Sequence, residues 1–454
     1  MTPWHRFRND VITAVNIAAP EQFNALFFST DEILAAQRRS LHTLLSHAVE
    51  HSPFHRRRLG DIDVTDIDPT DLSALPVMTK AEMMEALDDV FTDPRLRRGD
   101  IESSLAATVE RPVPILDDYI ALSTGGCSGR RGLFVYDRAA TAGFLSALAR
   151  PPVESLRCAT APTKPPRIAM VAAPSAVHAT GLLAALTEGG DAPAHVDLVP
   201  ATQPIWEIVD RLNAWQPEVL GGYASMLVRL AVEAGAGRLR IAPTEVNTTS
   251  ETLLPEMRVS IREAFGVPVF DGFGSTEGLV GKTGPDDDVF AFNTDMCIVE
   301  LVDADNRPVA PGVPSAKVLV TNLYNLVQPL IRYELTDIFT RQPDADEHGH
   351  LRARVQGRSD DVLRYQHTTI HPIAIRSVLA TTPGVTDYQV HQTVCGIEVF
   401  AIFEDDRVQY GLAGRLRRAL VDAGLNRPEV TVHAVDRVDR HPVSGKLRRF
   451  VPLI

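Results

Sequence analysis

Between residues 167 and 271 short runs rich in β-branched residues alternate with longer amphipathic stretches. The short runs, which we expect to be strands, are RIAMVAA (167–173), HVDLV (195–199), EVLGG (218–222), EVNTT (245–249) and VPVFDGF (267–273). Apolar residues at i, i+3 and i+4 spacing predict helices between them, near 179–187, 202–214, 224–234 and 254–265. Such alternation is typical of parallel strands joined by crossover helices, so the sequence predicts an α/β sheet.

After about residue 290 the pattern changes to strands, with CIVELVD, AKVLVTNLY and LRARVQGR. A smaller unit follows, with two expected helices (HPIAIRSVLA and GLAGRLRRALVDAG), a strand pair (VTDYQVHQ and GIEVFAIFE) and a last strand (EVTVHAV). The first hundred residues have a mostly helical pattern. We therefore expect a large α/β N-terminal domain over residues 1–357 and a small α+β C-terminal domain over residues 358–454.

Composition excludes several classes of protein. Lys+Arg 45 against Asp+Glu 58 gives a net charge of -13 without a basic stripe, so we expect no nucleic-acid partner. No apolar run approaches the roughly 18 residues of a membrane span, and the N-terminus lacks the apolar centre of a signal peptide. The cysteines are far apart, which argues against a disulfide framework or a zinc ribbon and predicts a soluble, cytoplasmic protein: Cys127, Cys158, Cys297 and Cys395.

Two stretches have the character of ligand-binding loops. The segment STGGCSGRRG (123–132) combines glycines, small hydroxyls and arginines, as phosphate-binding loops do, although it fits neither GxxxxGK[ST] nor GxGxxG. A plain surface turn is the alternative for this segment. The strand that ends in FDGFGSTEG (270–278) is a natural ligand site, because open α/β sheets bind ligands at the carboxyl ends of their strands. GYASM (222–226) lacks the G-x-S-x-G frame, so hydrolase chemistry is unsupported.

Taken together, STGGCSGRR, FGSTEG, LIRYELTDI, GRSDDVL and VSGKLRR resemble, in order and rough spacing, the motifs of the adenylate-forming enzymes of the acyl-CoA ligase superfamily. The likeness is greatest to the phenylacetate-CoA ligase branch, including its members similar to coenzyme F390 synthetase. The segments LLSHAVEHSPFHRRRL and LPVMTKAEM also resemble the N-terminal region of that branch. This resemblance covers nearly the whole chain. It implies an enzyme that uses ATP and Mg²⁺ to adenylate a small carboxylic acid, with release of pyrophosphate and transfer of the acyl group to CoA.

By this resemblance the phosphate loop consists of Thr124, Gly125, Gly126, Cys127, Ser128 and Gly129. The family has Ser or Thr where Cys127 stands, and a thiol is a poorer donor than a hydroxyl. We therefore expect Ser128 and the backbone amides to do more of the phosphate binding. The family's proline and following Lys or Thr are replaced by Arg131 and Gly132.

The same resemblance gives FGSTEG a role in nucleotide binding through Phe273, Gly274, Ser275, Thr276 and Glu277. Phe273 would face the adenine, Thr276 would bond the phosphate, and Glu277 would hold the Mg²⁺ ion, which prefers carboxylate and phosphate oxygens. The alternative is a helix N-cap at Ser275 or Thr276. Ser250 and Glu251 stand where related enzymes line the adenine pocket.

The remaining motifs supply charged residues by the same resemblance. Asp337 would bind the ribose hydroxyls with support from Arg358, Asp360 would be the hinge of a mobile C-terminal domain, and Lys446 would be the catalytic lysine. An ammonium that enters only for the first step would stabilise the transition state without holding the product. The alternatives are ordinary turn acids and a solvated basic tail.

The resemblance implies an acid pocket near His178, Tyr223 and Ala224, and an aromatic acid as substrate. A hydrogen-bonded structural role is the alternative for His178. His348 and His350, close to Asp346 and Glu347, could hold a metal, although a solvated hairpin tip is the favoured interpretation.

The acceptor is the least determined feature. Gln366 and His367 stand where relatives carry at least one glycine beside the CoA tunnel, and side chains there would narrow the passage. Two alternatives to transfer to CoA therefore stay open: transfer of the acyl group to an amine, and activation of nitrite as the adenylated group for diazo formation. A non-catalytic nucleotide-binding or scaffold protein is the alternative of another class. The sequence does not decide whether the chain forms a dimer.

Overall fold

The computed structural model describes residues 2–108, 110–124, 132–153, 166–188, 195–343, 348–366, 368–370, 372–403, 411–442 and 444–453. The chain divides into two compact units, Met1–Gln356 and Gly357–Ile454. This division lies one residue before the expected boundary. That the units are an adenylation domain and a mobile domain stays a prediction.

The first hundred residues are helical, as expected. They form α1 (Pro3–Ala25), α2 (Thr30–His51), α3 (Pro53–Leu59), the 3-10 turn η1 (Val64–Asp66), α4 (Lys80–Glu85), α5 (Leu87–Val90) and α6 (Arg98–Ala107). Ser29 and Thr79 each begin a helix with a capping box, in which hydroxyl and glutamate satisfy two backbone amides. Within the described parts of the chain, no helix has the length and apolar composition needed to cross a bilayer.

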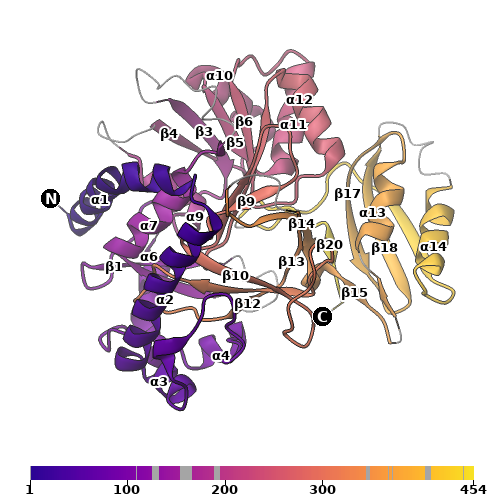
Figure 1. Cartoon of the computed structure of the whole chain (residues 1–454). Coiled ribbons are helices and arrows are strands. Elements are labelled where there is room, and N and C mark those ends of the chain that lie inside the picture. The colour runs from indigo at the N-terminus through magenta and orange to yellow at the C-terminus, as the bar shows by residue number, and fades with distance from the viewer. Residues whose placement is uncertain are drawn as a thin grey trace. The chain divides into compact units, whose positions relative to one another are not determined.

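The alternating region forms the parallel sheet that the sequence predicts. Its strands β3 (Arg167–Ala172), β4 (His195–Pro200), β5 (Val219–Gly222), β6 (Glu245–Thr249) and β7 (Val269–Gly274) pair in parallel. The crossover helices are α9 (Ala179–Leu186), α10 (Ile205–Trp215), α11 (Ala224–Gly235) and α12 (Pro255–Phe265). Figure 1 shows α10, α11 and α12 on one face of these strands, and their side chains share one apolar core with the sheet.

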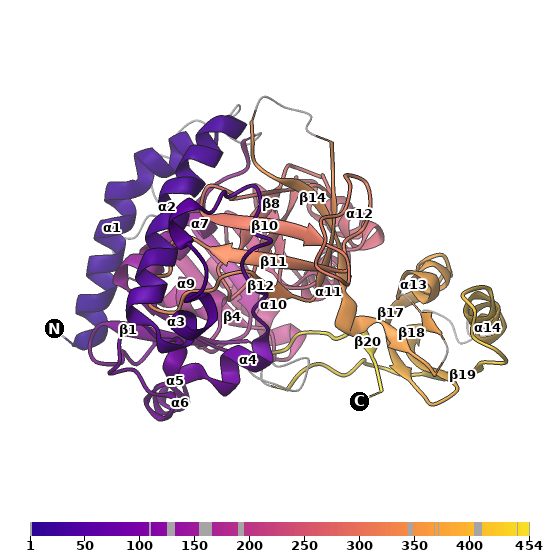
Figure 2. The same cartoon turned by 60° about the horizontal axis from the view of Figure 1, so that its bottom comes forward.

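After β7 the chain reverses and extends the same sheet. In the described residues the strand order is β13-β14-β9-β8-β7-β6-β5-β3-β4, where β8 is Val280–Thr283, β9 is Phe290–Phe292, β13 is Asp337–Arg341 and β14 is Arg352–Arg358. Because β7 and β8 are antiparallel, a turn lies at the carboxyl end of β7. A further sheet contains β10 (Cys297–Val302), β11 (Lys317–Asn322) and β12 (Tyr333–Leu335), and Figure 2 shows β10 and β11 running in opposite directions.

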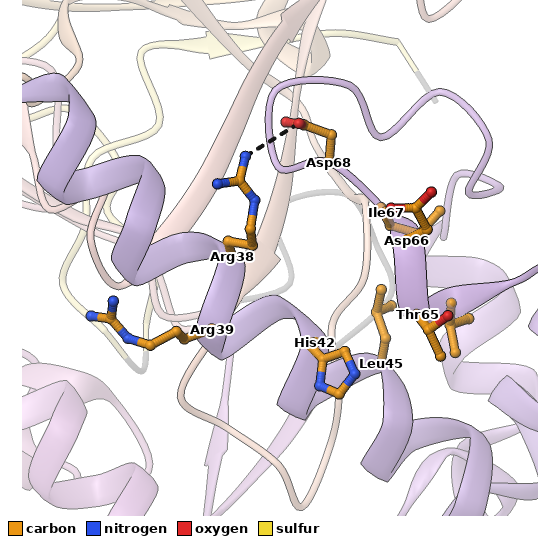
Figure 3. Close-up of a pocket in the computed structure, with 9 residues that line it drawn as sticks. Arg38, Arg39, His42, Leu45, Thr65, Asp66, Ile67 and Asp68 are labelled. Atoms are coloured by element: carbon orange, nitrogen blue, oxygen red, sulfur yellow. Dashed lines mark hydrogen bonds and ion pairs between the residues drawn. The ribbon is translucent and has the colours of Figure 1, made fainter.

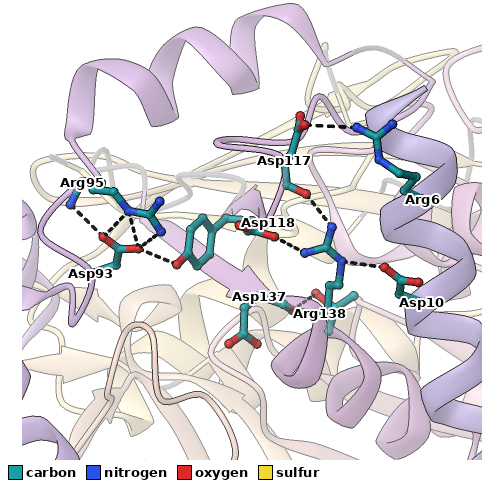
Figure 4. Close-up of polar contacts among 10 residues, drawn as sticks. Arg6, Asp10, Asp93, Arg95, Asp117, Asp118, Asp137 and Arg138 are labelled. Atoms are coloured by element: carbon teal, nitrogen blue, oxygen red, sulfur yellow. Dashed lines mark hydrogen bonds and ion pairs between the residues drawn. The ribbon is translucent and has the colours of Figure 1, made fainter. Parts of the chain in front are cut away.

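The segment that resembles a phosphate loop connects two antiparallel strands, β1 (Tyr119–Ser123) and β2 (Leu133–Asp137), and β2 leads into α7 (Arg138–Ala149). Polar contacts fix the end of this hairpin that lies away from the loop (Figure 4). Arg138 forms ion pairs with Asp10 of α1, at 3.0 Å, and with Asp118. The Tyr119 hydroxyl donates to Asp93 at 2.7 Å, and the neighbouring Arg95 holds the pKa of the Asp93 carboxyl well below its usual range.

The second unit has the α+β composition that the sequence predicts. It contains the 3-10 turn η2 (Ser359–Asp361), β15 (Leu363–Arg364), β16 (Thr369–Ile370), α13 (Pro372–Ala380), β17 (Val385–Gln392), β18 (Gly396–Phe403), α14 (Leu412–Asp422), β19 (Glu429–Ala434) and β20 (Phe450–Val451). The order β19-β18-β17-β20 describes its larger sheet among the described residues, and both helices contribute to its apolar core.

Candidate active site

The structure describes the base of the loop between β1 and β2. The backbone N–H of Thr124 donates to the carbonyl of Gly132 at 3.1 Å, and the N–H of Gly132 donates to the Thr124 hydroxyl at 2.9 Å. These two bonds close the loop at its base. The other expected phosphate-binding residues lie outside the described residues: Gly125, Gly126, Cys127, Ser128 and Gly129.

A lysine from the N-terminal helical region also lies at this base. The ammonium of Lys80, at the start of α4, donates to the Thr124 hydroxyl at 3.3 Å. Lys80 belongs to the TKAEM segment, in which Thr79 and Glu82 form the capping box that fixes the first turn of α4. The fold thus brings a half-buried cation to the loop from a position 44 residues earlier in the chain.

The FGSTEG segment forms the hairpin turn between β7 and β8. Ser275 N–H donates to the carbonyl of Leu279 at 2.9 Å, and Gly278 N–H donates to the carbonyl of Ser275 at 3.0 Å. The helix N-cap that was the alternative for Ser275 and Thr276 is therefore wrong. Thr276 is half-buried, and Glu277 is 8% exposed.

This turn is bonded directly to the hairpin that carries the loop. The hydroxyl of Tyr136, on β2, donates to the carbonyl oxygen of Thr276 at 2.6 Å. Burial raises the pKa of Tyr136 well above its usual value, and the nearby carboxylate of Glu277 adds to the effect. The phenol therefore stays protonated and keeps donating. The strand that follows the loop is thus hydrogen-bonded to the FGSTEG turn within the first unit.

Aromatic contacts fix the ring of Phe273. It makes T-shaped contacts with Phe290, Phe292 and Phe339, at centroid distances of 6.5, 5.6 and 5.3 Å. Phe339 lies on β13, which begins with Asp337, so the half-buried Asp337 stands two residues from a ring that contacts Phe273. The assignments of these two residues to adenine and ribose stay predictions.

Ser250 and Glu251 follow β6, and both have a role in the local structure. Ser250 has a φ of 66°, in the left-handed region where non-glycine residues are uncommon. The Glu251 carboxylate accepts a hydrogen bond from the backbone N–H of Ser225 at 3.0 Å. Glu251 thereby joins the end of β6 to the first turn of α11.

The residues expected in the acid pocket lie around the same helix and the end of β1. Tyr223 is 1% exposed and Ala224 is fully buried; the Tyr223 hydroxyl accepts a bond from the N–H of Ala173 at 2.9 Å. The half-buried His178 places Nδ1 3.2 Å from the carbonyl of Ser123, and because a carbonyl only accepts, Nδ1 carries the proton. His178 therefore has at least the structural bond of the alternative interpretation.

Lys446, Arg358 and Asp360 belong to the second unit. Lys446 ends a tight turn in which the N–H of His441 donates to its carbonyl at 2.9 Å, and Gly445 has a φ of 70°. The Lys446 side chain is half-buried, whereas Arg358 is exposed at the end of β14. Asp360 lies in η2, and its side chain is outside the described residues. Approach of Lys446 to the nucleotide stays a prediction.

Metal ligands are sparse in the described ranges. No group of three or more His, Cys, Asp or Glu side chains that could hold a metal occurs among these residues. Mg²⁺ in nucleotide enzymes commonly takes one or two carboxylates together with phosphate oxygens. Glu277 is a buried carboxylate in the turn that follows the exposed Gly274 at the end of β7, and it fits that habit.

The solvated hairpin tip expected for DADEHGH is wrong for His350. His350 is 8% exposed; its Nε2 lies 2.8 Å from the carbonyl of Ala25, and its Nδ1 lies 3.3 Å from the Thr294 hydroxyl. Burial lowers the pKa of His350, which favours the neutral ring. The ring of His348 packs against Phe27 at 5.6 Å. Asp346 and Glu347, the carboxylates considered as further metal ligands, lie outside the described residues.

A pocket of about 500 Å³ lies between α2 and the segment 64–68 (Figure 3). Its polar lining includes Arg38, Arg39, His42 and Asp68, and none of the residues predicted for nucleotide or acid binding belongs to it. Arg38 and Asp68 form an exposed ion pair at 3.3 Å across the opening. Exposed ion pairs of this kind contribute little to stability. The pocket is therefore not included in the candidate active site.

Comparisons with known proteins concern the fold of the chain. No family model matches the chain. A segment of 162 residues is 25% identical to protein CapK of Staphylococcus aureus; it covers 34% of this chain and 34% of CapK, so the match spans about a third of that relative. Phenylacetate-coenzyme A ligase of Aromatoleum evansii is 20% identical over 381 residues, which cover 78% of this chain and 77% of the relative.

Among solved structures, 2-hydroxyisobutyryl-CoA ligase in the postadenylation state matches with a TM-score of 0.70 and 18% identity, over 93% of this chain and 89% of that chain. The amide bond synthetase McbA from Marinactinospora thermotolerans matches with a TM-score of 0.53 and 15% identity, over 74% and 68%. At these identities the likeness is one of fold. The predicted fold class and the resemblance suggested by the motifs are confirmed at that level.

Proposed function

We propose that this chain, which has the fold of the adenylate-forming ligases, catalyses the ATP-dependent adenylation of a carboxylic acid. A carboxylate oxygen attacks the α-phosphorus of ATP, the bond to the bridging oxygen breaks, and pyrophosphate leaves. An acceptor then displaces AMP from the acyl adenylate. The observation that carries this proposal is the bond from Tyr136 to the Thr276 carbonyl, which joins the strand after the loop to the FGSTEG turn.

Charge neutralisation on the phosphates is the central demand of this displacement. Glu277 would hold Mg²⁺, and Mg²⁺ when bound supplies positive charge to the phosphate oxygens. The Thr276 and Thr124 hydroxyls and the loop amides would donate to the same oxygens. Lys80 adds a cation at the base of the loop, where its ammonium already contacts Thr124.

The remaining roles complete the first step. Asp337, as an acceptor-only side chain, would bind the ribose hydroxyls, with Arg358 in support. Phe273 would face the adenine, and Ser250 and Glu251 would line the adenine pocket. Lys446 would come from the second unit to the forming acyl phosphate, and rotation about Asp360 would withdraw it afterwards.

We infer an aromatic acid as substrate, in a pocket near His178, Tyr223 and Ala224. The relative named as a phenylacetate-coenzyme A ligase supports this inference. CoA is the default acceptor, since two of the similar proteins, phenylacetate-coenzyme A ligase and 2-hydroxyisobutyryl-CoA ligase, are named as CoA ligases.

A second candidate is transfer to an acceptor other than CoA. Tyr365 and Thr368 close a hairpin between β15 and β16, and the exposed Gln366 stands at its tip where relatives carry glycine. The likeness of fold to an amide bond synthetase supports an amine acceptor. The departure from glycine also leaves open the ATP-dependent activation of nitrite, in place of a carboxylic acid, without CoA.

The test is acid-dependent exchange of labelled pyrophosphate into ATP, measured over a panel of aromatic and aliphatic carboxylic acids together with nitrite. We expect exchange with the wild type, strong loss in Glu277→Gln, and no change in Glu256→Gln, an exposed glutamate of α12. Mass spectrometry of reactions supplied with CoA or an amine then identifies what displaces AMP. Absence of acid-dependent exchange over the whole panel would favour the non-catalytic nucleotide-binding protein.

A further inference from the structure

Three consecutive carbonyl oxygens of the FGSTEG turn each accept a hydrogen bond from a different buried or half-buried side chain. Tyr136 donates to the carbonyl of Thr276 at 2.6 Å, Asn322 Nδ2 to that of Glu277 at 2.9 Å, and the Tyr324 hydroxyl to that of Gly278 at 2.9 Å. The three donors come from β2, from the last residue of β11 and from the loop after it. These side chains therefore fix the path of the turn backbone together with its own backbone hydrogen bonds.

Gly278 allows this close approach. It has a φ of 104°, and a Cβ atom at this position would meet the amide nitrogen of Asn322 and the hydroxyl of Tyr324. Any other residue would both strain the backbone and displace two of the three donors. The three hydrogen bonds to Thr276, Glu277 and Gly278 thus require glycine at position 278.

The segment that contains Asn322 and Tyr324 also holds the strand after the loop. Asn322 Oδ1 accepts from the N–H groups of Tyr324 and Asn325, both at 3.0 Å, which fixes the segment 322–328. Asn325 Nδ2 then donates to the carbonyl of Val135 at 3.0 Å, and Gln328 accepts from the Val135 N–H at 2.8 Å. One short segment therefore keeps β2 and the turn at a fixed separation.

We propose that Tyr136, Asn322 and Tyr324 are positioning residues that hold the backbone of the turn so that the Thr276 hydroxyl and the Glu277 carboxylate meet the Mg²⁺–nucleotide in a preset orientation. This inference rests on the proposed function. Donors and ligands that are oriented before the substrate arrives need no reorganisation during the reaction. Burial also keeps the Tyr324 phenol protonated, since it raises the pKa of Tyr324 well above its usual value.

The test compares Tyr136→Phe and Tyr324→Phe, each of which removes one hydroxyl and keeps the ring. Tyr119→Phe is the matched control, because it removes a phenol hydrogen bond at the opposite end of β1. Calorimetry measures the affinity for a non-hydrolysable ATP analogue with Mg²⁺ and with EDTA, and thermal unfolding checks the fold. We expect each test variant to lose about fivefold in Mg²⁺-dependent affinity, the usual effect of one lost hydrogen bond.

The affinity in EDTA should stay unchanged in both test variants, and the control should be unchanged under both conditions. Equal loss with Mg²⁺ and with EDTA, or no loss at all, would overturn the inference. If the wild type lacks acid-dependent pyrophosphate exchange, the proposed function fails separately, and the calorimetry still reports on the positioning residues. Should one variant fold poorly, the other gives the same comparison, since the two phenols hold different carbonyls.

Discussion

The carboxylate of Glu251 caps α11 from outside the helix, by accepting a hydrogen bond of 3.0 Å from the backbone N–H of Ser225. The residue at the N-cap position, Tyr223, provides no side-chain cap. Glu251, which is predicted to line the adenine pocket, therefore also fixes the start of α11, where the acid pocket is expected. Changes at Glu251 should alter stability as well as binding.

We expect Glu251→Ala to lower the free energy of unfolding by about 1 kcal/mol, the usual effect of losing a helix cap. Glu251→Gln, which keeps an acceptor oxygen, should lose less. Urea unfolding measures both, with Glu263→Ala, an exposed position of α12, as the control. Equal stabilities of wild type and Glu251→Ala would show that the cap contributes nothing.

Lys446→Ala should reduce acid-dependent pyrophosphate exchange by roughly 10²-fold or more, because it removes a charge that acts in the transition state. The affinity for ATP should change little, since the lysine enters only for the chemical step. The variant should still consume acyl adenylate made by the wild type in the presence of the acceptor. A variant that exchanges pyrophosphate at the wild-type rate would remove Lys446 from the mechanism.

Lys80→Ala should weaken ATP binding by about fivefold or more, because it takes a cation away from the base of the phosphate loop. Lys80→Arg should retain part of the affinity. Lys317→Ala, which breaks a half-buried pair with Glu334 at 2.7 Å, is the matched control in the same unit. The measurement is calorimetric titration with an ATP analogue, and equal affinities of Lys80→Ala and wild type would contradict the role.

The buried His55 should make the protein acid-sensitive. Its Nε2 lies 2.9 Å from the carbonyl of Pro329, and burial lowers the pKa of His55 to about 3. Between about pH 6.5 and about pH 3 the unfolded chain binds a proton that the folded protein does not, so stability falls as the pH falls through this window.

The wild type should therefore lose about 2 kcal/mol more than His55→Gln between pH 7 and pH 5, as measured by urea unfolding at each pH. The comparison with the variant isolates this group from Asp271, whose effect has the opposite sign. Burial raises the pKa of Asp271 to about 6, so its contribution to stability is lost as the pH rises. Parallel pH profiles of wild type and variant would mean that His55 titrates normally.

Gly278→Ala should be severely destabilising or inactive, because the new methyl group meets Asn322 and Tyr324 and the φ of 104° disfavours alanine. Gly235→Ala at the end of α11 is the contrasting control, since a Cβ there meets nothing within 4 Å. That control should gain about 0.5–1 kcal/mol from helix propensity. Thermal unfolding of the three proteins, with pyrophosphate exchange, decides the comparison.

Local patterns were enough to predict most elements of the fold. The expected strands at 195–199 and 245–249 correspond to His195–Pro200 and Glu245–Thr249, and the expected helix at 254–265 corresponds to Pro255–Phe265. In these segments hydrophobic periodicity and terminal signals agree with the tertiary structure. Gly266, in the left-handed conformation after α12, is one such signal.

The relationships within the site depend on distance in space and were not available from periodicity. The contact of Lys80 with Thr124 spans 44 residues, and that of Tyr136 with Thr276 spans 140. His350 had the composition of an exposed turn but is buried, because Gly349 lets the backbone lie against Thr30. Only the packing of α1 and α2 against this segment determines its environment.

The amide side chains along β2 also affect how the protein meets other chains. Val135 has both its N–H and its carbonyl engaged, by Gln328 and Asn325, and the carbonyl of Leu133 accepts from Gln328 at 3.0 Å. A strand edge with open donors and acceptors is a template for pairing with another extended polypeptide. Along this part of β2 the backbone groups are already hydrogen-bonded to side chains of the same molecule. These bonds protect the strand next to the loop against pairing with a strand of another molecule.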